Sequence, residues 1–335
     1  MARRTYKGEG MVMKVAILGA GRIAHSMAEA LSGIAEAQKY AVAARDLERA
    51  ETFAKEWGFT KAYGSYEEML KDPEVELVYV ATPHSHHYEH AKLCLEHGKN
   101  VLLEKAFTVN AKQAEELITL AREKKKLLAE AIWTRYMPSR KMIDDLLAEE
   151  VIGKVTSITA NLCYEIQDKE RMQEPSLAGG ALLDLGVYTI NFAKMVVKKD
   201  VKEVISHAVM SPKGIDWMDS ITLIFEDDTM AVLHSSMLSE SNRMGLICGE
   251  KGYLEVQNIN NCEQIRLYDA DHKLCKIYEV PEQINGYEYE VRACIKAIQE
   301  GKIECEEMPH EEILWVMRLM DRIRNDWGMV YPFEK

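Results

Sequence analysis

The sequence predicts an α/β protein: an N-terminal Rossmann-type, doubly wound parallel sheet followed by a C-terminal α/β domain built on a large, mostly antiparallel open sheet. Three observations lead to this prediction. A continuous apolar run at residues 15–18 breaks into glycines and continues directly as helix-forming residues. Apolar strands and amphipathic helices then alternate to about Trp133, as in doubly wound folds. Beyond residue 164, long stretches of alternating polar and apolar residues indicate antiparallel strands.

In the first half, the run at 15–18 opens the parallel sheet, with residues 11–13 leading into it. A helix follows the glycines. Four further strands are expected where apolar residues cluster, at 39–46, 76–82, 99–107 and 127–133. Helical patterns at 48–57 and 110–126 lie between strands. This order predicts right-handed connections between parallel strands.

In the second half, the segment 217–238 is expected to form a hairpin that turns at Glu226, Asp227 and Asp228. Other strands are predicted at 202–210, 244–257, 264–269 and 274–280, and helices at 286–300 and 310–327. The predicted helices are enough to cover only one face of this sheet. An open, partly apolar face is normally covered, which predicts a homodimer assembled through the C-terminal sheets.

The length of 335 residues predicts two domains of ordinary size. We assign residues 11–133 to a dinucleotide-binding domain and 134–335 to a substrate-binding and dimerisation domain, with residues 1–10 as a disordered arm. The sequence contains no internal repeat, low-complexity tract or flexible linker. The two domains are therefore expected to be closely apposed.

Net charge, cysteine content and the length of apolar segments indicate which partners and which compartment to expect. The net charge of −12 is not offset by a basic stripe, so neither nucleic acid nor an anionic membrane surface is expected as a partner. Seven cysteines, an odd number without a C-x-x-C pair, are spread through apolar segments and are expected to be reduced core thiols. No segment approaches the ~18 apolar residues of a membrane span. These features together predict a cytoplasmic protein.

The glycines after the first strand indicate a dinucleotide site. Gly19 permits a tight turn, Gly21 lets a ligand approach the main chain, and Ala24 lets the following helix pack against the strand. The free amides of the first helical turn, at Arg22 and Ile23, then face the ligand. An anion such as a pyrophosphate is favoured there. A glycine turn that binds no ligand is the alternative.

The second strand ends in Arg45, where an NAD-binding fold ordinarily carries a carboxylate for the ribose hydroxyls. A guanidinium at this position complements a 2′-phosphate, which predicts NADP in preference to NAD. Asp46 lies beside Arg45 in the sequence. The alternative interpretation is an exposed arginine that ends a strand.

The segment after the third apolar strand, ATPHSHHYEH, contains histidines 84, 86 and 87. No carboxylate or cysteine at a suitable spacing completes a metal site, so no metal is expected. The carboxyl end of a parallel strand faces the cofactor cleft. We therefore predict that Thr82, Pro83, His84 and His87 line the nicotinamide side.

Two further groups carry the chemistry of the predicted site. Glu104 and Lys105 follow an apolar strand, again at the carboxyl edge of the sheet. Gly179 and Gly180 precede a helix on which Asp184 and Tyr188, at i and i+4, share one face. An acid and a phenol on one face are suited to proton transfer. On these residues alone, Lys105 can equally be an exposed loop residue and Tyr188 a packing residue.

Four longer sequence motifs are the basis of a resemblance to a known family: VAARDLERA, KAYGSYEEMLKDP, EAIWTRYMP and AGGALLDLGVY. With these strings the chain resembles the Gfo/Idh/MocA oxidoreductases from Met11 to Pro332. The resemblance implies a dinucleotide loop at Gly19, Gly21 and Ala24, an NADP-selecting arginine at Arg45, and the lysine of an E-K-P motif at Lys105. It also matches His87 to the histidine that begins the helix after the third strand. Ala106 departs from the pattern, because the family has proline there.

For the second half of the chain, the resemblance implies that Asp184 and Tyr188 are the acidic and acid–base positions and that Trp133 and Arg171 lie near the substrate. Within the family the chain is most similar to NADP-dependent members that oxidise an aldopyranose such as D-xylose, or a trans-dihydrodiol. The resemblance leaves open whether Tyr188 or Lys105 is the proton acceptor. Two alternative functions also remain open: an inositol or other polyol dehydrogenase, and a catalytically silent NADP-binding regulator.

Overall fold

The computed structural model describes residues 12–334 and divides them into two compact units. The first unit comprises the described residues up to Thr108 together with Lys112–Trp133 and Gln283–Leu314. The second comprises Val109–Ala111, Thr134–Glu282 and the chain from Trp315 onward. The predicted arm at residues 1–10 lies outside the described residues.

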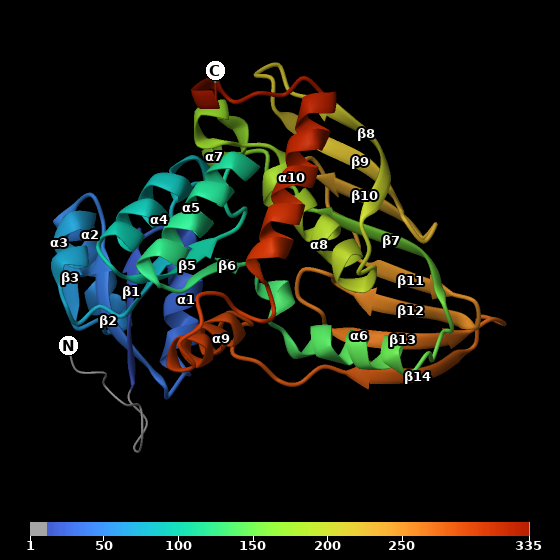
Figure 1. Ribbon diagram of the computed structural model, residues 1–335, viewed down its shortest axis with the longest axis horizontal. Coiled ribbons are helices and arrows are strands. Elements are labelled where there is room, and N and C mark those ends of the chain that lie inside the picture. The colour runs from blue at the N-terminus through green and yellow to red at the C-terminus, as the bar shows by residue number, and fades with distance from the viewer. Residues whose placement is uncertain (1–11, 335) are drawn as a thin grey trace. The chain divides into compact units, whose positions relative to one another are not determined.

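The first unit contains a six-stranded sheet in the order β3-β2-β1-β4-β5-β6, and every pair of neighbours is parallel (Figure 1). The predicted Rossmann sheet is therefore confirmed. Its strands are β1 (Met13–Leu18), β2 (Ala37–Ala43), β3 (Lys61–Tyr63), β4 (Leu77–Val80), β5 (Asn100–Glu104) and β6 (Leu128–Ala131). Its helices are α1 (Arg22–Ser32), α2 (Leu47–Trp57), α3 (Tyr66–Lys71), α4 (His87–Glu96), α5 (Ala111–Lys124) and α9 (Glu288–Gln299). The three residues of β3 are too few to show a periodicity in the sequence.

Helix α9 corrects the predicted division of the chain. Residues 283–314 were expected in the second domain, but the structure groups them with the first unit. The reason is packing: α9 buries Val291, Cys294 and Ile295 and lies against α1 and β5. The backbone of Leu128 in β6 also donates to the carbonyl oxygen of Ile303 at 3.0 Å.

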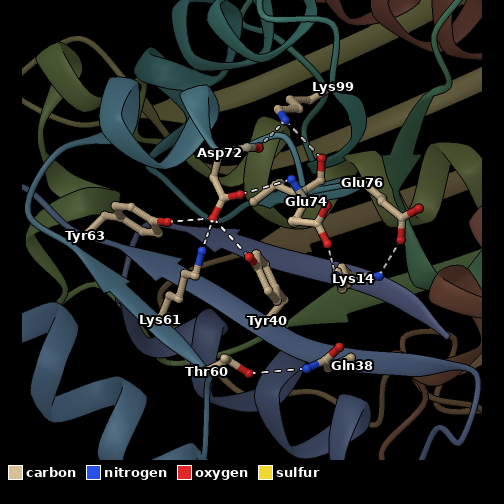
Figure 2. A network of polar contacts seen from close by, with 11 residues as sticks. Lys14, Gln38, Tyr40, Thr60, Lys61, Tyr63, Asp72, Glu74, Glu76 and Lys99 are labelled. Carbon is tan, nitrogen blue, oxygen red and sulfur yellow. Dashed lines mark hydrogen bonds and ion pairs between the residues drawn. The ribbon is translucent and has the colours of Figure 1, made fainter.

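A polar network around Asp72 joins several elements of this sheet (Figure 2). Asp72, which ends α3, is buried, and its Oδ2 accepts from the hydroxyls of Tyr40 (3.1 Å) and Tyr63 (2.7 Å) and from Nζ of Lys61 (2.7 Å). Nζ of Lys99 donates to the carbonyl oxygen of Asp72 at 2.6 Å. The network thus ties β2, β3 and α3 to the start of β5.

The second unit contains an eight-stranded sheet in the order β14-β13-β12-β11-β7-β10-β9-β8 (Figure 1). All neighbours are antiparallel except β7 and β10, which confirms the predicted mostly antiparallel sheet. Its strands are β7 (Val155–Cys163), β8 (Val201–Met210), β9 (Asp216–Phe225), β10 (Met230–Ser236), β11 (Gly245–Gly249), β12 (Gly252–Gln257), β13 (Gln264–Asp269) and β14 (Leu274–Glu279). The remaining helices are α6 (Pro138–Ala148), α7 (Glu170–Gln173), α8 (Val187–Val196) and α10 (His310–Asp326), of which α10 begins in the first unit and continues in the second from Trp315.

The segment 244–257 was expected to be one strand, and this expectation is wrong. Gly249 pairs with Gly252, so the chain turns back at Glu250 and Lys251 and forms the hairpin β11–β12. A Cβ on Gly252 would lie 2.1 Å from the carbonyl oxygen of Tyr268. Glycine is therefore needed for the close approach of β13.

The two faces of the second sheet differ in polarity and cover. One cross-strand row, of Leu223, Ala231, Ile158, Ile247 and Leu254, is fully buried, on the face that α6 and α8 cover in Figure 1. A row of the opposite face contains Ile205, Thr222, Val232, Thr159 and Leu246. None of these five side chains is fully buried.

The cysteines only partly follow the prediction of core thiols. Five are buried, but Cys248 is half-buried and Cys275, on the edge strand β14, is exposed. Alternation along β11 places Cys248 on the open face. Within residues 12–334, no helix is long and apolar enough to cross a membrane.

Candidate functional site

The glycine turn between β1 and α1 has the shape of an anion cradle. Gly19 has a φ of +103°, and a Cβ there would lie 2.9 Å from the carbonyl oxygen of Ala81, so this position requires glycine. A Cβ on Gly21 would meet nothing closer than 3.9 Å. Packing within the chain thus does not explain Gly21, whereas a ligand that approaches the main chain does.

The first turn of α1 is open to a ligand. Gly21 is the N-cap residue, and no side chain caps the helix. The amides of Arg22 and Ile23 therefore lie at an uncapped helix start, where an anion is stabilised. Ala24 is fully buried, as close packing of α1 on the sheet requires.

Arg45 follows β2 and is exposed. The neighbouring Asp46 is the N-cap of α2, and its carboxylate accepts from the amide of Glu48 at 3.0 Å. Arg49, in the first turn of α2, donates from Nε and Nη2 to the carbonyl oxygen of Ala20 at 3.0 and 2.7 Å. Arg49 thus fixes the glycine turn. Sequence reasoning missed this residue.

The segment after β4 is organised around His87, which begins α4. His87 is fully buried, and its ring nitrogens lie 2.8 Å from the carbonyl oxygens of Thr82 and Ala106. Burial lowers the pKa of His87 to about 4, although both carbonyls act in the opposite direction. His87 therefore bridges the turns that follow β4 and β5.

Thr82, Pro83 and His84 form the turn itself. Oγ1 of Thr82 lies 3.0 Å from Nδ1 of His90. Pro83 precedes a single 3₁₀ turn, His84–His86, and His84 is buried with its ring edge-on to His87. Among the described residues, no group of three His, Cys, Asp or Glu side chains could hold a metal ion.

Glu104 and Lys105 lie at the carboxyl end of β5. The buried Glu104 accepts from the hydroxyl of Tyr79 and, at 3.2 Å, from the amide of Lys105. Lys105 is half-buried, and its peptide bond with Ala106 is cis. On the other side of Ala106, the amide of Phe107 donates to Glu130 at 3.0 Å.

Glu130 is a second residue that sequence reasoning missed. It is buried in β6 within an otherwise apolar strand, and an acid at such a position was the available signal. The carboxylates of Glu104 and Glu130 together fix the backbone on both sides of Ala106. The first unit thus brings Thr82, His87 and the Glu104–Lys105 pair together at one edge of its sheet.

Trp133 is the last residue of the first unit's second segment and starts a 3₁₀ turn, Trp133–Arg135. It is buried and stacks on Tyr287, with ring centroids 4.5 Å apart and an interplanar angle of 22°. Its role near a substrate remains a prediction.

Asp184, Tyr188 and Arg171 belong to the second unit. Arg171 in α7 forms a bidentate ion pair with the buried Asp184, with N–O distances of 2.9 and 3.2 Å. Tyr188 is buried in the first turn of α8. The helical register differs from the prediction: Asp184 lies in a π turn, Leu182–Gly186, that precedes α8.

The two glycines before this turn are both required by close contacts. A Cβ on Gly179 would lie 2.6 Å from the carbonyl oxygen of Met172, and Gly180 has a φ of +119°. The hydroxyl of the buried Tyr331 donates to the carbonyl oxygen of Gly179 at 2.8 Å. Tyr331 is far from Gly179 in the sequence, so no sequence signal indicated this contact.

Comparison with protein families gives two matches. Residues 13–132 match the model of an oxidoreductase family with an NAD-binding Rossmann fold. Residues 141–255 match the model of the GFO/IDH/MocA C-terminal domain.

Alignments with similar proteins cover nearly the whole length of this chain. The trans-1,2-dihydrobenzene-1,2-diol dehydrogenase of Xenopus tropicalis is 35% identical, and the alignment covers 96% of this chain and 100% of that one. The human protein of the same name is 31% identical, with 97% and 100% covered.

Among solved structures, the 3-ketoreductase KijD10 from Actinomadura kijaniata, in complex with NADP and TDP-benzene, has a TM-score of 0.85 and 26% identity over 93% of this chain and 97% of that one. An aldose-aldose oxidoreductase from Caulobacter crescentus, complexed with glycerol, shows the same fold, with a TM-score of 0.85 and 20% identity over 93% and 96%.

Proposed function

The chain belongs to the Gfo/Idh/MocA family of oxidoreductases, and from this premise we propose that it is an NADP-dependent dehydrogenase that oxidises a hydroxyl of a sugar or cyclic diol. The observation that carries the proposal is the uncapped glycine turn at Gly19 and Gly21. The room beside Gly21 and the free amides of α1 suit the pyrophosphate of a dinucleotide.

The choice of NADP rests on the end of β2. The Asp46 carboxylate is engaged as the cap of α2, while the guanidinium of Arg45 is exposed and can pair with a 2′-phosphate. KijD10, a structural relative, is in complex with NADP. We therefore favour NADP over NAD as the cofactor of this chain.

In the proposed reaction, Tyr188 takes the proton of the substrate hydroxyl. When bound, NADP⁺ supplies the acceptor for the hydride. A free phenol has a pKa of about 10, so Tyr188 needs a positive charge to act near neutral pH, and Lys105 is the candidate for that charge. Asp184, held by Arg171, would orient the substrate. The reverse assignment has Lys105 as the proton acceptor and Tyr188 as the orienting group. Variants of these two residues distinguish the assignments.

The substrate class follows from the relatives. Two of them are named for a cyclic diol, and the Caulobacter protein is named for aldoses. An aldopyranose such as D-xylose, or a trans-dihydrodiol, is thus the first candidate, and inositol or another polyol the next. The contrasting function is a silent NADP-binding regulator of the same fold.

We also propose a homodimer through the C-terminal sheets, in a reducing, cytoplasmic setting that suits the five buried thiols. Four apolar side chains on the open face, Ile205, Val209, Met230 and Val232, are 42–50% exposed. Such a face is normally covered by a partner, and a second copy presents the same apolar surface.

A substrate panel tests the activity. D-xylose, D-glucose, myo-inositol and trans-1,2-dihydrobenzene-1,2-diol are each incubated with NADP⁺ or NAD⁺, and reduced cofactor is followed by absorbance. We expect turnover of at least one compound and at least tenfold tighter binding of NADP than of NAD, about 1.4 kcal/mol. Arg45→Ala should shrink that gap. Tight NADP binding with no turnover would favour the regulator.

Variants of the two candidate groups test the mechanism. Tyr188→Phe should reduce turnover by about 10²- to 10⁴-fold, as expected for loss of a general acid or base, with NADP affinity little changed. The double variant with Lys105→Met should be scarcely slower than the slower single variant, because residues that act as a unit are not additive. Near-normal turnover of Tyr188→Phe beside an inactive Lys105→Met would reverse the assignment.

A further inference from the structure

The turn that carries Asp184 and leads into Tyr188 is buried and irregular. Residues 182–186 form a π turn, and this turn and the first seven residues of α8, Val187–Ala193, are buried. A π turn is less stable than a regular α-helical turn and frequently lies at a functional site. The surrounding residues must therefore hold it in place.

Asp216, the first residue of β9, lies under the start of this turn. It is fully buried, and its Oδ2 accepts from the amide of Leu182 at 2.6 Å. A Cβ on Gly180 would lie 2.2 Å from Oδ1 of Asp216. Gly180 and Asp216 thus fit each other closely where the turn begins.

Asp219, further along β9, lies under the other end of the turn. It is also buried, and its Oδ2 accepts from the hydroxyl of Ser235 in β10. A Cβ on Gly186 would lie 3.3 Å from Oγ of Ser235 and 3.4 Å from Oδ2 of Asp219. The last residue of the π turn therefore lies directly on this hydrogen-bonded pair.

The two carboxyls occupy positions that packing alone would fill with apolar residues. Ile221, Leu223 and Phe225 continue β9 on the same buried face. Oδ1 of Asp216 and Oδ1 of Asp219 have no hydrogen-bond partner among residues 12–334. A buried carboxyl with an unpartnered oxygen destabilises the fold, so a role in stability does not explain either residue.

We propose that Asp216 and Asp219 are positioning residues, which hold the two ends of the π turn 182–186 so that Asp184 and Tyr188 are presented in a fixed orientation. This inference rests on the proposed function, in which Asp184 and Tyr188 meet the substrate. Asp216 acts through the amide of Leu182, and Asp219 acts through Ser235 and the backbone at Gly186.

The test combines hydrogen exchange with kinetics on the full chain. In Asp216→Ala the amide of Leu182 loses its acceptor, so exchange of the peptide that spans residues 181–188 should accelerate at least tenfold. Turnover should fall about 10- to 100-fold, while NADP affinity changes less than threefold. Asp216→Asn retains an oxygen that can accept from Leu182 and should recover most of both losses. Ser235→Ala should accelerate exchange at the Gly186 end of the turn.

Asp72→Asn is the matched control, because Asp72 is likewise a buried aspartate that accepts a backbone amide, at 3.0 Å from Glu74, but belongs to the first unit. It should leave exchange of residues 181–188 unchanged. Unchanged exchange of this segment in both Asp216→Asn and Ser235→Ala, and in Asp216→Ala where that variant folds, would overturn the positioning role. If the parent protein oxidises no polyol, the proposed function fails, and the exchange data still decide the positioning role.

Discussion

At the scale of single residues, burial gives aspartates in this chain opposite properties. Burial raises the pKa of Asp216 and of Asp219, and the charge of Asp219 raises the pKa of Asp216 further. Burial acts in the same direction on Asp72, but hydrogen bonds from Lys61, Tyr63 and Tyr40 outweigh it and hold the pKa of Asp72 well below its usual range. Asp72 thus differs from the two aspartates of β9 in having an ammonium, from Lys61, and two phenol hydroxyls as partners.

Asp219 should make stability depend on pH. Burial raises its pKa from 3.8 to about 7, so the folded state binds more protons than the unfolded state between these two values. The stabilisation linked to protonation of Asp219 is fully present below the pKa of this group in the unfolded state. It is lost as pH rises through this window, so the free energy of unfolding falls by at most about 4 kcal/mol. Urea unfolding of the parent and Asp219→Asn at several pH values between 4.5 and 8 measures the effect.

The difference in unfolding free energy between the two proteins cancels the titrating groups that do not interact with Asp219. Asp216 on the same strand and His234, whose Nδ1 lies 2.6 Å from the carbonyl oxygen of Asp219, do interact with its charge, so their titration contributes to the difference. The parent should lose stability relative to Asp219→Asn as pH rises. Parallel pH curves for the two proteins would show that Asp219 keeps an ordinary pKa.

The sequence predicts that residues such as Arg45, Glu104 and Lys105 lie at the ends of strands. It does not predict that Asp216 and Asp219 lie on the buried face of their strand. Regular alternation places residues three apart on opposite faces of a strand. Here β9 is irregular near Trp217, because Met210 pairs with Asp216 while Val209 pairs with Met218. This bulge brings both carboxyls to the buried face.

At the scale of elements, polar networks fix segments that have little apolar area of their own. β3 has three residues, none of them fully buried. The Asp72 network in Figure 2 joins it to β2 and α3 through Lys61, Tyr63 and Tyr40. The edge of the first sheet therefore depends on one carboxylate.

Asp72→Ala should lower the free energy of unfolding by about 1–3 kcal/mol, because it leaves two tyrosine hydroxyls and one ammonium without their shared acceptor. Gln38→Ala is the control, since Gln38 makes an exposed 3.3 Å hydrogen bond to Thr60 in the same region, and it should change stability by less than about 0.5 kcal/mol. Urea unfolding measures both. Equal effects would mean that the Asp72 network adds nothing.

The elements also show where sequence patterns succeed. Strands β1, β13 and β14 and helices α2, α5, α9 and α10 lie within one or two residues of their predicted ends, apart from the lead-in at residue 11. The β11–β12 hairpin was missed because its turn contains Glu250 and Lys251 rather than the asparagine or proline of a typical turn. Its two glycines serve tertiary contacts, because Gly252 allows the approach of β13 and Gly249 that of the backbone of Ile152.

At the scale of the molecule, the division of the chain was only partly predictable. The structure divides its units between Trp133 and Thr134, whereas the texture of the sequence changes only beyond residue 164. The return of residues 283–314 to the first unit has no sequence signal, because an amphipathic helix such as α9 can bury its apolar face against either sheet. Tertiary packing, rather than local pattern, selects the sheet.

The open face of the second sheet leads to a prediction about assembly. Sedimentation should show a dimer at micromolar concentration, and Val232→Lys should weaken it at least tenfold, about 1.4 kcal/mol, because the ammonium loses water without gaining a partner. Leu47→Lys is the control, since Leu47 is a similarly exposed apolar residue on α2 in the first unit. A parent protein that sediments as a monomer would contradict the proposal.

The return of residues 283–314 to the first unit also sets the order in which the protein can be completed during synthesis. The carbonyl oxygen of Leu128 accepts from Nε2 of His310 at 2.8 Å, and the amide of Leu128 donates to Ile303. When β6 leaves the ribosome, neither partner has been translated. The first unit therefore waits, with the edge of β6 and the surface beneath α9 unfinished, until all the strands of the second sheet have been made. A nascent chain that stalls before residue 283 therefore leaves exposed the surface of α1 and β5 on which α9 packs.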